Sequence, residues 1–132
     1  MASISDNWPG MQNIDADSDH ARRIQSVLES ANWNYLSGKA VELRQAHTQE
    51  ALTCSIDTTK FASGFNNVVV ALTFSDSVQW IARVALPQEE ESDKSEARQS
   101  LLSEVATLNL IRAKTKVPVA QVFDYGLPTK DF

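Results

Sequence analysis

The stretch FASGFNNVVVALTFSDSVQWIARVAL, Phe61–Leu86, decides the fold of this chain. Apolar residues alternate in two runs, which predicts two β-strands. The polar triplet Ser75-Asp76-Ser77 between the runs predicts a hairpin turn. A further strand is predicted over residues 52–61, and the glycine-containing turn 62–66 separates it from the next. Three consecutive strands joined in this way form an antiparallel meander.

Helical patterns lie on both sides of this meander. Ser18 and Asp19 offer an N-cap to a short helix whose apolar residues recur at steps of three and four. A second helix is predicted from about Asn34 to Ala46. The longest helix is predicted from Ser95 to about Lys114. The fold class expected from these patterns is α+β, an antiparallel sheet with one long packed helix, preceded by two short N-terminal helices.

The predicted segments divide the chain into three parts. Residues 1–17 are polar and predicted to be a flexible arm. Residues 18–50 form an N-terminal helical extension, and residues 51–132 form the lobe that contains the sheet and the long helix. Within this lobe, residues 88–94 contain three successive glutamates and are predicted to be a solvated loop. Residues 117–126 are predicted to be a short final strand that begins near a proline.

Composition narrows the class of protein. The chain has 132 residues and a net charge of −5, so a broad electrostatic grip on nucleic acid is not expected. Its start lacks the basic and apolar regions of a secretory signal, and no run is long enough to span a membrane. The single cysteine, Cys54, cannot form an internal disulfide, which fits a reducing, cytoplasmic location. His20 and His47 lack metal-ligand spacing, so no metal site is expected.

One charged residue lies within each of two apolar patterns. Arg83 lies inside the strand pattern of residues 78–86, and Glu104 lies between Leu101 and Leu108 on one face of the long helix. Both charges are therefore predicted to be at least half-buried, and a buried charge needs a partner or a ligand. We expect the two to pair, because removing either one would leave an uncompensated buried charge. Such a pair serves either a structural network or a phosphate-binding site.

Five motifs together resemble the aminoglycoside phosphotransferase family in its fungal form, which has a protein-kinase-like fold. Their order and spacing agree over roughly residues 52–126. The motifs are Ser63-Gly64-Phe65-Asn66, Phe74-Ser75-Asp76, Trp80-Ile81-Ala82-Arg83, Ser103-Glu104-Val105-Ala106-Thr107-Leu108 and Thr115-Lys116-Val117-Pro118-Val119.

The resemblance implies an ATP-binding N-terminal lobe. By this resemblance Gly64, Phe65 and Asn66 belong to the loop that covers the phosphates of ATP. Arg83 matches the position that contacts the α- and β-phosphates, and Glu104 matches its partner on the helix. There are departures: serine replaces the first loop glycine, alanine takes the place of a second proline after the helix, and arginine replaces the lysine of kinases.

The family's catalytic loop, His-Gly-Asp followed by a downstream Asn, and the later magnesium-binding Asp are not found in this chain. We therefore expect a partial or truncated phosphotransferase that is inactive alone, with no catalytic or metal-binding residue of its own. Magnesium would join ATP only if a C-terminal lobe is supplied. The expected partners are a nucleotide and that lobe, or a second copy bound through exposed apolar surface. The alternative is a non-catalytic, degenerate kinase-like module used in protein contacts, in which the Gly64 turn is an ordinary hairpin.

Overall fold

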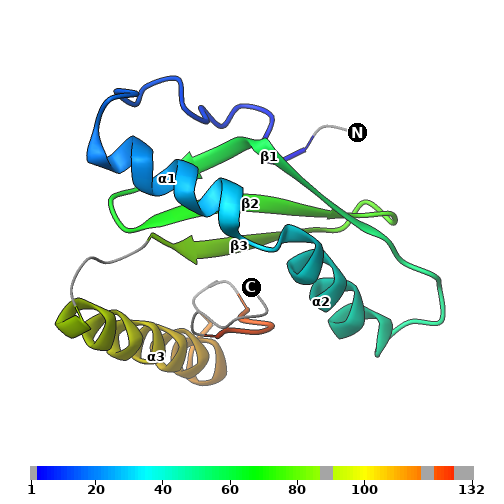
Figure 1. The fold of residues 1–132 in the computed structure, drawn as a ribbon. Helices are drawn as coiled ribbons and strands as arrows, with labels where there is room; N and C mark the ends of the chain where they lie inside the picture. The colour runs from blue at the N-terminus through cyan, green and yellow to red at the C-terminus, as the bar shows by residue number, and fades with distance from the viewer. Residues whose placement is uncertain (1–2, 87–90, 117–120, 127–132) are drawn as a thin grey trace. The chain divides into compact units, whose positions relative to one another are not determined.

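The computed structural model describes residues 3–86, 91–116 and 121–126, without the side chains of residues 91–98 and 100. The chain is α+β and divides into two compact units, Met1–Pro87 and Gln88–Lys130, which are described separately below. The first unit holds two helices and a three-stranded sheet, and the second holds one long helix (Figure 1). The elements are α1 Asp19–Ser30, α2 Trp33–Gln45, β1 Cys54–Ser63, β2 Asn67–Phe74, β3 Gln79–Ala85 and α3 Glu91–Lys114.

The three strands form the predicted antiparallel meander in the order β1-β2-β3. β2 is the central strand, and its alternate residues Val68, Val70, Leu72 and Phe74 are buried in the core. The turn after β2 is a tight hairpin, in which the Phe74 amide donates to the Val78 carbonyl over 2.9 Å. The alternation of apolar residues in the sequence therefore predicted the buried face of β2 correctly.

β1 contains an irregularity that changes which of its side chains face the core. Ile56 pairs with Leu72, whereas Phe61 pairs with Val70, so residues 57–60 are matched by Ala71 alone. Ile56 and Phe61 therefore share the core face although they are an odd number of residues apart. Phe61 is only 2% exposed. Such a bulge inserts extra residues into one strand and redirects its side chains.

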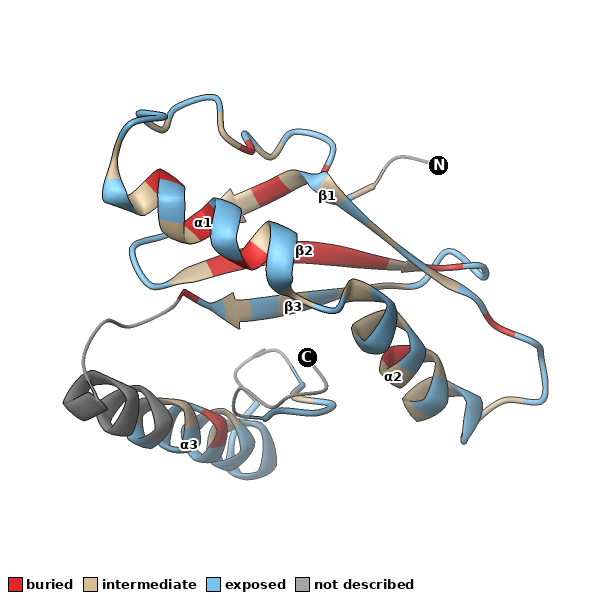
Figure 2. Cartoon of the chain, viewed as in Figure 1, coloured by how far each residue is buried: buried red, intermediate tan, exposed pale blue. Residues whose placement is uncertain are grey.

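The two N-terminal helices cover the core face of the sheet (Figures 1 and 2). The Ser18 hydroxyl caps α1 by accepting from the Ala21 amide over 3.1 Å, as the sequence predicted. The Asn32 side chain caps α2 in the same way. Ile24 and Val27 of α1 are buried in the same cluster as the inward side chains of β2. The helical extension predicted over residues 18–50 therefore shares one core with the sheet.

Residues 3–17 pack within the first unit, so the prediction of a flexible arm over residues 1–17 is wrong for them; residues 1–2 lie outside the described residues. The Gly10 amide donates to the Phe61 carbonyl over 2.8 Å, and Lys60 pairs with Asp6 over 3.1 Å. Met11 and Ile14 pack against the core cluster. The arm is polar, but its few apolar residues and backbone groups find partners that are distant in the sequence, which composition does not reveal.

The second unit contains α3 and the segment that follows it. The helix begins at Glu91, so the predicted loop over residues 88–94 is wrong for 91–94; residues 88–90 lie outside the described residues. Acidic residues favour the first turn of a helix, which explains the earlier start. Residues 121–126 are not a strand, and the rest of the predicted strand, 117–120, lies outside the described residues. The described sheet contains only β1, β2 and β3, all of which belong to the first unit.

The bulge in β1 can be tested by comparing two neighbouring substitutions. We expect Phe61→Ala to lower the free energy of unfolding by about 3–5 kcal/mol, because it leaves a cavity in the core. Lys60→Ala should cost about 1 kcal/mol or less, since it removes an exposed ion pair. Urea unfolding of both variants measures the difference. Equal losses would show that Phe61 is not the residue that β1 turns into the core.

Candidate functional site

Arg83 lies on the face of the sheet opposite to α1 and α2. In β3 the core-facing residues alternate with Gln79, Ile81, Arg83 and Ala85, and these four define what we call the outer face. Arg83 pairs in register with Val69 of β2. Its side chain is exposed, so the prediction of a buried or half-buried arginine is wrong. The reason is that the helices of this unit cover only the other face.

The loop between β1 and β2 lies at the same end of the sheet as Arg83. The Gly64 amide donates to the Asn67 carbonyl over 3.0 Å, and the Leu86 amide donates to the Asn66 carbonyl over 2.8 Å. The second bond ties the loop to the end of β3. Arg83 precedes Ala85, the partner of Asn67, by two residues, which is about 7 Å along an antiparallel strand. The predicted loop residues and Arg83 are therefore neighbours in space.

Among the described residues, the space around Gly64 is open to a side chain. A Cβ atom added to Gly64 would meet no atom within 4 Å. Among the glycines of the described residues, Gly10 alone has a positive φ. Phe65, the next residue, is 80% exposed at the loop tip. The described residues therefore impose no steric requirement for glycine at position 64.

Glu104 lies on α3, in the second unit. The helical spacing places it on the same face as Leu101 and Leu108, as predicted, but its side chain is exposed, so its predicted burial is wrong. A carboxylate gives up much hydration energy when it is buried, so exposure is the lower-energy state within this unit. Because Arg83 and Glu104 belong to different units, their pairing stays a prediction.

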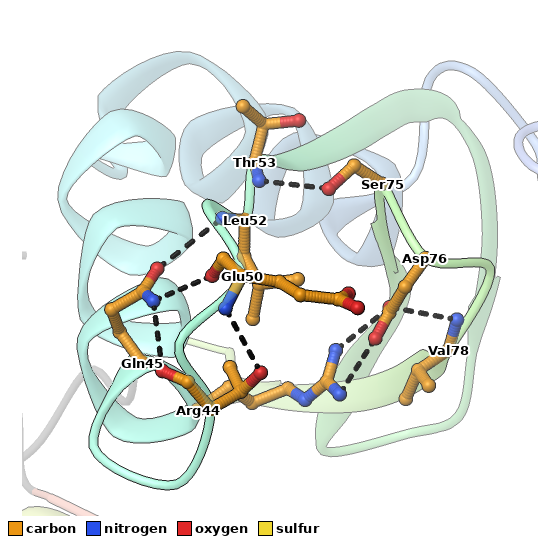
Figure 3. A network of polar contacts seen from close by, with 9 residues as sticks. Arg44, Gln45, Glu50, Leu52, Thr53, Ser75, Asp76 and Val78 are labelled. Atoms are coloured by element: carbon orange, nitrogen blue, oxygen red, sulfur yellow. Dashed lines mark hydrogen bonds and ion pairs between the residues drawn. The ribbon is translucent and has the colours of Figure 1, made fainter.

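Sequence reasoning missed an ion pair at the opposite end of the sheet. Arg44 of α2 binds Asp76 of the β2–β3 turn through both terminal nitrogens, at 2.8 Å each (Figure 3). The two side chains are 19% and 28% exposed. The guanidinium carbon also lies 4.7 Å from the centre of the Phe74 ring, a cation–π arrangement. Hydrogen bonds from Arg44 lower the pKa of the Asp76 carboxyl, and the carboxylate raises the pKa of Arg44.

Gln45 extends this contact into the segment that leads to β1. Its side-chain oxygen accepts from the Leu52 amide over 3.2 Å, and its nitrogen donates to the Thr48 and Glu50 carbonyls (Figure 3). We call Arg44, Gln45 and Asp76 the α2 clasp. Its two charged members are 32 residues apart, so no local pattern could have indicated it. The clasp satisfies backbone groups of the chain itself, which marks it as a structural device rather than a catalytic one.

The described residues offer no set of three or more His, Cys, Asp or Glu side chains that could hold a metal ion. Among the described helices, none has the length and apolar character to cross a membrane. No protein-family model, no curated protein and no solved structure matches this chain. Function must therefore be inferred from the geometry of the outer face and its loop.

The α2 clasp makes the stability of the first unit depend on pH. The pKa of Asp76 is lowered from 3.8 in the folded chain, so its stabilising contribution is present above that value and is lost as pH falls through the lowered pKa. We expect the melting temperature of the wild type to fall more steeply below about pH 4 than that of Arg44→Gln. Circular dichroism melts across this range measure both slopes. Parallel slopes would contradict the assignment of the acid-sensitive step to the clasp.

Proposed function

We propose that this chain is the nucleotide-binding N-terminal lobe of an ATP-dependent small-molecule phosphotransferase, similar to the aminoglycoside phosphotransferases. The observation that carries the proposal is the position of Arg83 on the outer face, next to the loop of Gly64, Phe65 and Asn66. A strand cation beside a short hairpin loop is the arrangement with which kinase-like enzymes hold the phosphates of ATP.

The chemistry of these groups suits a polyphosphate. The guanidinium of Arg83 is always charged and presents several N–H donors in one plane, which match phosphate oxygens. The loop can approach a phosphate closely at Gly64, because no side chain stands there and the space around it is open. Turns of this kind use backbone N–H groups as anion ligands.

The outer face also offers an apolar surface for the base. Ile81 lies two residues before Arg83 on the same face and is 57% exposed. In register it pairs with Ala71, which is only 5% exposed, so Ile81 itself supplies the exposed apolar surface at this position. A nucleotide with its phosphates at Arg83 and the loop could therefore lay its base along β3 toward Ile81, which would remove the apolar side chain from water.

The proposed role ends at nucleotide binding. The described residues hold no group of three or more His, Cys, Asp or Glu side chains that could bind a metal ion. The general base and the magnesium ligands of the family are expected from a C-terminal lobe. We therefore assign Arg83, Gly64, Phe65 and Asn66 to holding the nucleotide, with Glu104 as the proposed partner that orients Arg83. No chemical step is assigned to this chain alone.

Titration of the labelled chain with ATP tests the proposal. We expect saturable NMR shifts at the amides of residues 64–67 and at the Arg83 side chain. Arg83→Gln should weaken ATP binding about tenfold or more, because a charge-assisted hydrogen bond contributes about 1.5–3 kcal/mol. The matched control is Arg22→Gln, which removes the same charge from an exposed pair with Asp19 on α1. Equal affinities of the two variants, or no saturable shifts, would refute the site.

Gly64 allows a second test in which folding and binding separate. Gly64→Ala should leave the urea midpoint unchanged or slightly raised, since the added methyl meets nothing and the unfolded chain loses freedom. The same variant should bind ATP more weakly, because the methyl would lie where the loop approaches the phosphates. Unchanged ATP affinity would argue that this loop does not cover the ligand.

One observation favours the alternative of a non-catalytic contact module. Phe65 is 80% exposed at the tip of the loop, and a large exposed aromatic side chain is common at protein interfaces. The two functions differ in the titration above. A contact module leaves the amides of residues 64–67 unaffected by ATP at any concentration.

A further inference from the structure

The N-terminal arm passes around the edge of β1 and reaches the outer face. Met11 and Ile14 pack against the helix-covered core, and Gly10 bonds to the edge of β1. Farther toward the terminus, the Ile4 amide donates to the side-chain oxygen of Gln79 over 3.0 Å. Gln79 is the first outer-face residue of β3. The arm therefore contacts the same face of the sheet as Arg83 (Figure 1 shows its course along β1).

Asp6 gives a second contact between the arm and the sheet. It pairs with Lys60 over 3.1 Å, and Lys60 precedes the core residue Phe61 in β1. Lys60 is the last residue of the irregular segment 57–60 of β1. Ile4 thus binds an outer-face residue of β3, and Asp6 binds a residue of β1, the other edge strand. Residues 3–9, which we call the strap, lie at the Gln79 end of the outer face.

Gly10 allows the arm to pass close to the backbone of β1. It has a φ of +57°, which favours glycine, and a Cβ atom there would lie 3.0 Å from the Thr59 carbonyl oxygen. A side chain would push the arm away from β1. The close approach at Gly10 is a specific anchor from which the strap extends.

The strap itself is weakly held. Its ion pair is exposed, with 38% of the Asp6 side chain and 45% of the Lys60 side chain accessible. Of the strap residues, Ser5 alone is buried, and Ile4 is largely exposed. Exposed ion pairs contribute little net stability. The strap can therefore leave the outer face while Gly10, Met11 and Ile14 stay in place.

We propose that the strap is an autoinhibitory segment that a nucleotide must displace from the outer face. The inference rests on the function proposed above. Gln79 lies about 7 Å from Ile81 and about 13 Å from Arg83 along β3. A nucleotide with its phosphates at Arg83 and its base directed toward Ile81 extends to the residues that the strap occupies. The two cannot occupy this end of the face together, so each weakens the binding of the other.

The test compares the ATP affinity of the full chain with that of two variants in which the strap is removed or its contact with β1 is weakened. One variant lacks residues 3–9, and the other, Asp6→Asn, keeps the full length in case the deletion fails to fold. We expect ATP to bind about fivefold more tightly to the shortened chain, because no strap has to be displaced from the outer face before ATP can bind. Asp6→Asn should shift affinity in the same direction by less. The matched control is Asp17→Asn, which removes one exposed acidic charge from the arm outside the strap.

A second readout follows the strap directly. ATP should speed hydrogen exchange at the Ile4 amide, whose bond to Gln79 is lost, and leave exchange at Gly10 unchanged. Tighter binding by the strap variants together with faster Ile4 exchange supports displacement. If ATP binds both variants with unchanged affinity, or if Ile4 exchange is unchanged, the autoinhibitory role of the strap is overturned. The proposed nucleotide site is left intact in that case. No binding by any form of the chain overturns both.

Discussion

The burial of one face of β2 is the constraint on which the first unit depends. β2 is paired on both edges, and its alternate side chains Val68, Val70, Leu72 and Phe74 lie in the core with Ile24 and Val27 of α1. A shift of one residue in this strand would exchange its buried and outer faces, so the register is held firmly. Through the two ladders that register fixes β1 and β3. It therefore decides that Arg83 lies on the face of the sheet opposite to α1 and α2.

The two ends of the sheet differ in how firmly their loops are held. At the end of the β2–β3 turn, the α2 clasp binds helix, connecting segment and turn through charge-assisted hydrogen bonds. At the other end, the Gly64 loop is tied to β3 through one backbone bond to Leu86, and its tip is open to solvent. Rigid support at one end and an accessible loop at the other is the usual division between scaffold and binding site.

The outer face unites the proposed function with the strap. Three alternate residues of β3 lie on this face. Arg83 provides a cation, Ile81 an apolar surface, and Gln79 the contact for the arm. If a nucleotide binds along this line, access to its site is governed by a segment more than fifty residues away in sequence. The strap would then couple the N-terminus to ligand affinity without any change in the core, since its contacts lie outside the buried cluster.

The sequence by itself determined the meander, the N-cap of α1, the approximate bounds of the helices, and the grouping of Arg83 with the Gly64 loop. These follow from alternation, capping residues and turn chemistry, which act over a few neighbouring residues. It did not determine the exposure of Arg83 and Glu104, the bulge that turns Phe61 inward, the α2 clasp or the placement of the arm. Residues 91–94 and 121–126 also differed from their predicted states. Each of these depends on which face another element covers, or on a partner tens of residues away. Only the tertiary structure decides that, because burial and pairing are properties of the packed chain and not of its local pattern.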